Sequence, residues 1–416
     1  AGPAVIISFL IAGIVCGAAV MCYAEFASMI PVAGSAYTFT YTTVGEIMAW
    51  IIGWDLILEM LMAGSVISKY WGVYLNDFMR LMGWNANTNL TFGSFHIDIA
   101  PIIIVAFFTT LLVFGTKIGA RVDGAMTVLK IAIVFFVVIV GFFYVKASNF
   151  TPFIPPSQPA STVEGSSAVT GVMTQPLWQF ATGMTPSVYG VPGILSGAAL
   201  VFFAFIGFDV VATASEETKN PHKNVPLGIG VGMLLIIVMY MLVAVVTTGM
   251  VSYADLAKQD SPSLATAFEL VGADWAAKII SFGIVLGLAT VVMVLLLGLT
   301  RIVFAMSRDG LLPRGLSKTG KHGTPAALQI VVGAVVALVA AFFDIGVLSD
   351  MVNIGTLSAF TLVAISIPIM RKKRPDLPRA FKMPGSPWIP ILIAVANFWL
   401  MLNLSVLTWI RFVVWL

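Results

Sequence analysis

One apolar stretch, from Gly193 to Pro226, constrains this chain more than any other segment. It begins as a membrane span, but Gly207 lies near its middle and Asp209 follows two residues later. Glycine disfavours a helix interior, and an acid at the centre of a bilayer costs roughly 2.5–3.5 kcal/mol on insertion scales. We therefore expect a helix that breaks inside the membrane, where its unwound turn offers backbone N–H and C=O groups to a small ligand.

Broken helices at the bilayer midplane are typical of secondary transporters.

The composition also indicates a membrane protein, because 59% of the 416 residues are hydrophobic and 10% are charged. A soluble domain cannot bury that much apolar surface. We interpret runs of about 18 or more apolar residues as spans. These segments are 4–22, 44–68, 99–116, 124–146, 194–214, 225–251, 276–304, 326–343, 351–370 and 388–409.

The lysines and arginines are sorted between the two sides of the membrane. Alternate loops hold most of them, and the positive-inside rule makes these loops cytoplasmic. They carry Lys117, Arg121, Lys219, Lys223, Arg308, Arg314, Lys318, Lys321, Arg371, Lys372, Lys373, Arg374, Arg379 and Lys382, against Lys69, Arg80, Lys258 and Arg411 on the opposite side. We interpret the basic loop 371–387 as an anchor at the headgroup level. The net charge of +3 is accordingly no sign of nucleic-acid binding.

Both ends of the chain predict a fragment. The orientation places Ala1 outside, entering the membrane directly without a starting Met or a signal peptide. At the other end, residues 409–416 are similar to the beginning of a further span. A pair of inverted five-helix repeats would need one more broken helix ahead of Ala1, since the spans before 194–214 fall one short of the number that such a repeat requires.

Two outer segments are longer than the other loops. Residues 76–98 are polar, and residues 147–193 are rich in Ser, Thr, Gly and Pro. The second segment predicts a flexible extracellular loop or insertion. Cys16 and Cys22 both lie in or at the end of the first span, so the sequence holds no disulfide framework.

Three blocks of sequence resemble the amino acid–polyamine–organocation superfamily. Cys22–Phe26, together with Pro31–Tyr37, is similar to the signature that joins its second and third helices. Phe202–Asp209, followed by Glu216–Pro221, is similar to its sixth helix and the next loop, and Arg301–Pro313 to the inner end of its eighth helix. The blocks occur in order over nearly the whole chain, which is most similar to the bacterial relatives of the cationic amino acid transporters.

The resemblance implies an all-α polytopic membrane protein with the leucine-transporter type fold, an inverted five-helix repeat. The predicted spans then correspond to helices two to eleven of that fold. Residues 1–146 would hold helices two to five of the first repeat, and residues 194–370 the second repeat. Residues 388–416 would form an accessory helix eleven and the start of helix twelve.

The resemblance also implies a site at the broken helix. Phe203 would cover an amino acid as a gate, while the backbone at Ala204 and Ile206 would meet its ammonium and carboxylate groups. Met293 matches a position that lines the side-chain pocket. The alternative interpretation of the Phe-rich run and of Met293 is packing. Gly207, Asp209 and Tyr240 are further core or gate candidates, Tyr240 through a hydrogen bond near Lys130 or the inner gate.

Lys130 lies seven residues into its span, roughly 10 Å deep at 1.5 Å per residue. An ammonium at that depth should face the bundle interior, and burial would bring its titration towards neutral pH. The resemblance adds that proton-coupled members carry a lysine on the fifth helix, where sodium-coupled relatives hold an ion. The alternative is a lysine that extends to the inner headgroups.

Glu59 lies near the middle of the span 44–68, and Asp55 lies one turn earlier on the same face. The first interpretation of Glu59 is a counter-charge for a cationic substrate, since the resemblance places the third helix beside the substrate site. The second is a structural acid that is bonded to a neighbouring helix or protonated. For Asp55 the structural interpretation is favoured.

The sequence carries no metal or cofactor motif. His96, His222 and His322 lie in loops without a ligand-spaced partner, and the chain has no phosphate-binding loop. We therefore predict secondary transport of amino acids, cationic ones preferred, coupled to protons through Lys130 in a bacterial plasma membrane. The expected partners are an amino acid, protons and lipid. The sequence leaves open whether a small accessory membrane subunit binds as well. The first alternative is a facilitator or exchanger for neutral or broad-range amino acids. The less favoured alternatives are an intramembrane enzyme and a pore.

Overall fold

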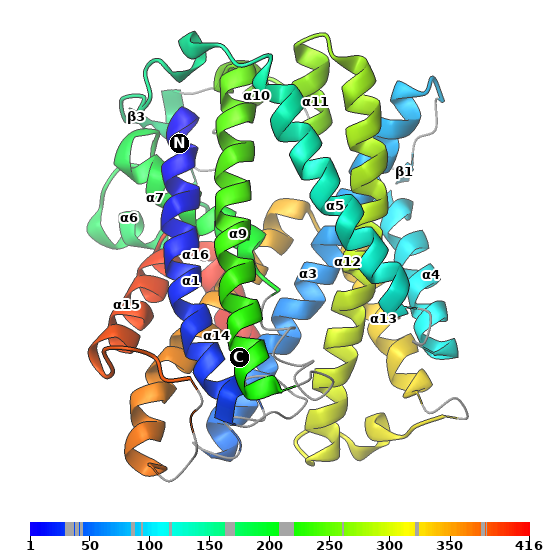
Figure 1. Cartoon of the computed structure of the whole chain (residues 1–416), viewed down its shortest axis with the longest axis vertical. Helices are drawn as coiled ribbons and strands as arrows, with labels where there is room; N and C mark the ends of the chain where they lie inside the picture. The colour runs from blue at the N-terminus through cyan, green and yellow to red at the C-terminus, as the bar shows by residue number, and fades with distance from the viewer. Residues whose placement is uncertain are drawn as a thin grey trace.

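The protein is a bundle of long helices in the computed structural model (Figure 1). The described residues are 1–29, 37, 41, 45–84, 88–92, 95–115, 119–162, 171–207, 220–259, 262–320, 324–375, 379 and 381–416. The helices of the bundle are α1 (Val5–Met29, preceded by the 3-10 turn η1, Gly2–Ala4), α3 (Glu46–Leu81), α4 (Ile99–Phe114), α5 (Gly119–Phe142), α7 (Gly190–Val201, continued by the 3-10 turn η5, Phe202–Phe205), α9 (Pro221–Met250), α12 (Asp274–Arg308), α13 (Ala326–Phe342), α14 (Ile345–Lys373), α15 (Trp388–Leu402) and α16 (Val406–Trp415).

Length and composition support a multi-pass membrane protein. Within the described residues, α1, α3, α5, α9, α12 and α14 are long and apolar enough to cross a membrane, and the remaining bundle helices are shorter apolar ones. Large apolar side chains such as Phe107 on α4 and Val128 on α5 are exposed on the outside of the bundle. Helices suit such surroundings because they satisfy their own backbone hydrogen bonds in lipid.

The centre of the bundle is formed by α3, α12 and α14. α3 packs along both other helices, and most of its side chains between Ile52 and Ser68 are buried. α1 packs on α7 and α9, α5 on α9 and α12, α13 on α4, and α15 on α14. Figure 1 shows α1 and α9 side by side in front of this centre.

Glycines permit several of these contacts. A Cβ atom on Gly13 of α1 would lie 2.9 Å from Ile237 Cγ1 of α9. One on Gly283 of α12 would lie 2.4 Å from Ile133 Cδ1 of α5. Each glycine belongs to a Gly-x-x-x-Gly pair, and such pairs let helix backbones approach closely in membranes.

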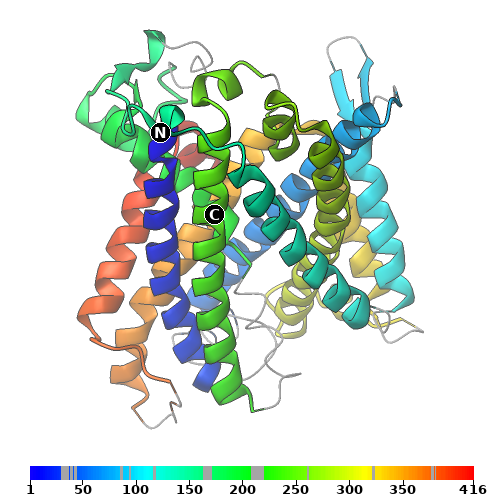
Figure 2. The ribbon, with the colours of Figure 1, turned by 45° about the horizontal axis from the view of Figure 1, so that its top comes forward.

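Short elements gather at the ends of the long helices. The hairpin β1 (Asn89–Phe92) and β2 (Phe95–Asp98) is antiparallel, with Asn89 opposite Asp98, and β3 (Gln158–Pro159) pairs with β4 (Ser187–Val188). Figure 2 shows both strand pairs at the end of the bundle where the chain begins. The other short elements are η2 (Ala147–Phe150), η3 (Ala160–Thr162), α6 (Leu177–Thr182), α10 (Tyr253–Ala257), α11 (Leu264–Leu270) and η7 (Arg314–Ser317).

The predicted span 388–409 is wrong as a single helix. α15 ends at Leu402, and α16 begins at Val406 after Ser405, whose hydroxyl accepts a hydrogen bond from Thr408 N at 3.2 Å. The turn at Asn403 to Ser405 interrupts the run because these side chains compete for backbone hydrogen bonds.

The segment between α5 and α7 holds this turn in place. Leu177 N donates to Leu404 O at 2.9 Å, while Val406 N and Leu407 N donate to carbonyls of the segment, Gln175 O at 3.1 Å and Met173 O at 2.8 Å. Such contacts satisfy the terminal backbone groups of α15 and α16. The described part of the segment is therefore folded against the bundle, which differs from the flexible loop that its composition predicted.

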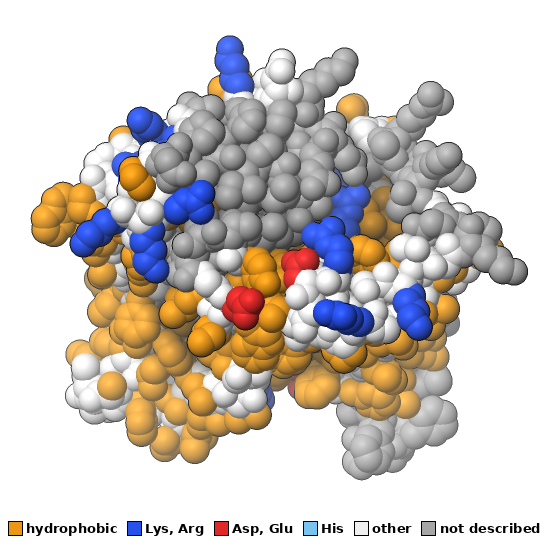
Figure 3. Space-filling model, turned by 90° about the horizontal axis from the view of Figure 1, so that it is seen from below, with side chains coloured by type: hydrophobic (Ala, Val, Ile, Leu, Met, Phe, Trp, Pro, Cys, Tyr) orange, Lys and Arg blue, Asp and Glu red, His pale blue; other side chains and the backbone are white. Residues whose placement is uncertain are grey.

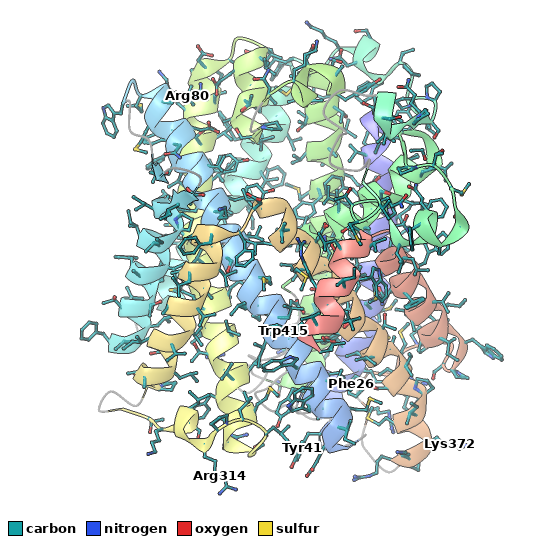
Figure 4. All side chains as sticks on the ribbon, turned by 180° about the vertical axis from the view of Figure 1, so that it is seen from behind. Phe26, Tyr41, Arg80, Arg314, Lys372 and Trp415 are labelled. Atoms are coloured by element: carbon teal, nitrogen blue, oxygen red, sulfur yellow. The ribbon has the colours of Figure 1, made fainter. Side chains whose placement is uncertain are left out.

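Charged side chains lie at both ends of the bundle. Figure 4 places Arg80 at one end and Arg314 and Lys372 at the opposite end. Viewed from the second end, the described side chains include more Lys and Arg than Asp and Glu (Figure 3). The loops that we assigned to the basic side after α12 and α14 therefore share one end.

Candidate functional site

The helix α7 breaks where the sequence predicted. It tightens into η5, after which Ile206 is extended (φ −71°, ψ 146°) and Gly207 has φ +120°. Glycine adopts such a conformation without the steric cost that a Cβ atom brings. The predicted break at Gly207 is thus confirmed, while Asp209 lies outside the described residues.

Side chains from two other helices bind the carbonyl groups at the break. The last carbonyls of a helix have no partner within it. Tyr240 Oη of α9 donates to Ala204 O at 2.8 Å, and Cys16 Sγ of α1, a weak donor, lies 3.8 Å from Phe205 O. Tyr240, a candidate from the sequence, thus contacts the break itself, and it occupies one acceptor position of a carbonyl that we assigned to the ligand.

Aromatic rings surround the same turn. The Phe205 ring lies 5.2 Å from that of Tyr240 and 6.3 Å from that of Phe9 on α1, and Phe9 lies 6.1 Å from Tyr240. The three rings meet edge-on or tilted, which is the arrangement that aromatic quadrupoles favour. The cluster fixes the side of the break that faces α1 and α9.

α14 also supports the broken helix. Asn353 Nδ2 donates to Leu200 O at 3.4 Å, and Phe360 packs against Phe202 with ring centroids 5.9 Å apart. Phe360 also contacts Tyr23 of α1 at 5.4 Å. The broken helix is therefore held between α1, α9 and α14.

The phenylalanines at the break differ in burial. Phe202 and Phe205 are 0% and 3% exposed, whereas Phe203 and Ile206 are only half-buried. The packing interpretation therefore fits Phe202 and Phe205. Among the described rings of this run, Phe203, the proposed gate, is the one that stays partly accessible.

A cavity of about 500 Å³ opens beside the break and is lined by Ala204 and Tyr240. Its other walls come mainly from α1, α5, α9 and α12, including Phe9 and Val137. None of the described residues that line it is an Asp, Glu, Lys or Arg. The cavity can therefore hold an apolar group next to the unwound backbone.

The two acids of α3 are fully inside the protein. Asp55 is 1% exposed and Glu59 0%. Ser358 Oγ of α14 donates to Asp55 Oδ2, which agrees with the structural role favoured for this acid. Since α14 packs against α3 and also contacts the break, it connects the acid-bearing helix with the unwound turn.

Lys130 is directed at α12 rather than away from the bundle. A Cβ atom on Gly287 would lie 3.2 Å from Lys130 Cγ, so the lysine stem crosses α12 where that helix has no side chain. Lys130 also shares a helical face with the cavity residues Ile133, Val134 and Val137, three, four and seven positions later. Met293, also on α12, is half-buried against the main core.

Cys16 and Asn353 are site residues that we did not predict from the sequence. Their signal was a polar side chain inside an apolar span, where hydrogen bonds to backbone are expected. Within the described parts of the chain, no group of three or more His, Cys, Asp or Glu side chains is placed to hold a metal ion.

We expect Tyr240→Phe to destabilise the break while it keeps the ring. Loss of the hydroxyl leaves Ala204 O without this donor, which should lower the free energy of unfolding by about 1–2 kcal/mol. Thermal unfolding of the purified protein in detergent measures the change. Tyr253→Phe, on α10 outside the bundle helices, is the control, and equal melting temperatures for the two variants would contradict the role of Tyr240.

Sequence comparisons relate the chain to known proteins. A sequence model of the family described as "Amino acid permease" matches residues 1–414. The branched-chain amino acid permease BcaP of Bacillus subtilis (strain 168) is 42% identical, and the alignment covers 100% of this chain and 84% of BcaP. The methylthioribose transporter of the same organism is 38% identical with the same coverage. The mitochondrial cationic amino acid transporter 3 of Arabidopsis thaliana is 37% identical over 89% of this chain and 57% of the plant protein.

Proposed function

The chain belongs to the amino acid permease family of the amino acid–polyamine–organocation superfamily, and we propose that it is a secondary transporter that binds an amino acid at the break after η5. The break supports this proposal most strongly. Its unwound backbone near Ile206 and Gly207 lies beside a cavity, and helix termini at membrane depth are suited to ammonium and carboxylate groups.

Transport would proceed by alternating access around this fixed site. The helix bundle would rock around the bound amino acid and expose the site to one side of the membrane at a time. The end that carries Arg314 and Lys372 would face the cytoplasm of a bacterial cell, with the protein in the plasma membrane.

The first candidate substrate is a neutral amino acid with an apolar side chain. The walls of the cavity beside Ala204 are apolar and carry no formal charge among the described residues, so they suit a branched aliphatic group. BcaP, 42% identical, is named for branched-chain amino acids. Uptake of radiolabelled leucine and arginine into proteoliposomes tests this candidate. The transport proposal would be overturned if neither leucine nor arginine showed saturable uptake.

The second candidate is a cationic amino acid, and Glu59 favours it. Its carboxylate is wholly buried on α3, where a cationic side chain could pair with it. The plant relative is named a cationic amino acid transporter. Both candidates share the backbone site and differ in what holds the side chain.

Glu59→Gln separates the two candidates. If the carboxylate pairs with the substrate, removing its charge should weaken arginine binding about tenfold or more relative to alanine, which corresponds to about 1.4 kcal/mol. Competition binding with arginine and alanine measures the ratio. Asp55→Asn is the control, because its bond to Ser358 predicts an equal loss for both ligands. An unchanged ratio in Glu59→Gln would make Glu59 a structural acid.

Proton coupling through Lys130 is the third part of the proposal. The lysine stem lies over Gly287, and the residue shares a face with the α5 wall of the cavity. Its amine would take up and release a proton during the transport cycle. A facilitator or exchanger would keep the same site but would not respond to a pH gradient.

A further inference from the structure

Glu25, in the signature Cys22–Phe26, is the most densely coordinated acid of the described structure. Its side chain is 0% exposed. Arg371 of α14 donates to both of its oxygens, from Nε to Oε1 at 2.9 Å and from Nη2 to Oε2 at 2.6 Å. Met383 N donates to Oε2 at 2.7 Å, and Arg379 Nε lies 3.5 Å from Oε1. Two guanidinium groups and a backbone amide therefore converge on one buried carboxylate.

The donors come from the last turn of α14 and from the connection to α15, a region (371–387) that we interpreted from the sequence as a headgroup anchor. That interpretation remains suitable for Lys372, Lys373 and Lys382, which are exposed. It does not describe Arg371 and Arg379, whose charges are directed at Glu25. Arg371 Nη2 also donates to Met383 O at 2.7 Å, so the two sides of the connection are joined.

The same two helices hold the broken helix. From α1, Cys16 contacts Phe205 O, and Ser8 Oγ donates to Ile194 O at 2.8 Å. From α14, Asn353 donates to Leu200 O. Glu25 lies nine residues after Cys16, and Arg371 eighteen after Asn353, roughly 14 Å and 27 Å along their helices. Phe26 follows Glu25 and Lys372 follows Arg371 in the chain, and Figure 4 shows both of these neighbours near the same end of the bundle.

We propose that Glu25 is a positioning residue for the substrate site, because it fastens α1 to α14 and keeps their donors in register on the broken helix. The proposal rests on the proposed function in taking the break as the substrate site. The fastening persists through the transport cycle, since opening it would leave the fully buried carboxylate of Glu25 without its partners. α1, α14 and the connection to α15 then move as one body.

The thiol of Cys16 reports on the proposal directly. In a Cys22→Ala background it is the one cysteine of the 416 residues, and it is buried against the break. We expect Glu25→Gln to raise the rate at which a maleimide labels Cys16 about tenfold, the change that a loss of 1.4 kcal/mol in local stability gives. The same variant should raise the KM for uptake, whereas a purely structural defect would lower the amount of folded protein at unchanged KM.

Two further variants keep the test decisive. Arg379→Gln removes the longest of the contacts and should give intermediate labelling in a folded protein if Glu25→Gln fails to fold. Glu269→Gln is the control, because it breaks a two-bond ion pair with Arg80 at the other end of the bundle, with both bonds 2.8 Å. Its Cys16 labelling and KM should match the parent protein.

The positioning role would be overturned if folded Glu25→Gln or Arg379→Gln showed the same rate of Cys16 labelling and the same KM as the Cys22→Ala parent. A labelling increase in Glu269→Gln as large as that in Glu25→Gln would overturn it as well. If the parent protein takes up no amino acid, the proposed function fails, while the labelling rates still decide whether Glu25 fastens α1 to α14.

Discussion

Lys130→Ala is expected to abolish uptake driven by an imposed pH gradient while amino acid binding persists. The lysine lies over Gly287 of α12, one helical turn from the α5 wall of the cavity, so it can respond to protons without holding the ligand. We expect uptake at the level of empty vesicles and a dissociation constant within about threefold of the parent protein. Proteoliposomes with an acidic exterior and a separate binding assay measure the two quantities.

Lys146→Ala is the matched control, since Lys146 is an exposed lysine just beyond the end of α5. It should leave gradient-driven uptake intact. Uptake by the parent protein that ignores the pH gradient would remove the coupling claim and leave a facilitator or exchanger. Loss of binding together with uptake in Lys130→Ala would instead place the lysine in the ligand site.

Gly207→Val is expected to lower substrate affinity about tenfold or more. Gly207 has φ +120°, a conformation that costs a non-glycine residue about 1–3 kcal/mol and a β-branched residue most of all. A Cβ atom there would meet no atom of the described residues within 4 Å, so the cost comes from the backbone and not from a clash with them. The strain is relieved by moving the turn whose backbone groups we assign to the ligand.

Gly230→Ala provides the comparison for this variant. Gly230 lies in α9 with an ordinary helical φ, and a Cβ atom on it would meet none of the described residues within 4 Å, so alanine should stabilise the helix by about 0.5–1 kcal/mol. Equilibrium binding of a labelled amino acid to both purified variants measures the effect. Parent-like affinity in Gly207→Val would show that the shape of the turn does not matter for the ligand.

The sequence was informative wherever a residue type has one physical outcome in a membrane. Long apolar runs became helices because lipid offers backbone groups no other partner. α7 and its continuation η5 end just before Gly207, because glycine adopts the φ of +120° that the unwound turn requires. The prediction of a single span over 388–409 was wrong, because apolar character alone does not reveal that the chain turns at Asn403 to Ser405 between two short helices.

The sequence by itself determined that the chain is a helical membrane protein with a broken helix at Gly207, since composition and backbone preference are local properties. Only the tertiary structure decided which side chains complete the break, because Cys16, Tyr240 and Asn353 are brought together from three helices far apart in the chain. It also decided that Glu25 binds Arg371, 346 positions away, since a buried carboxylate takes whichever cations the packing of helices brings to it.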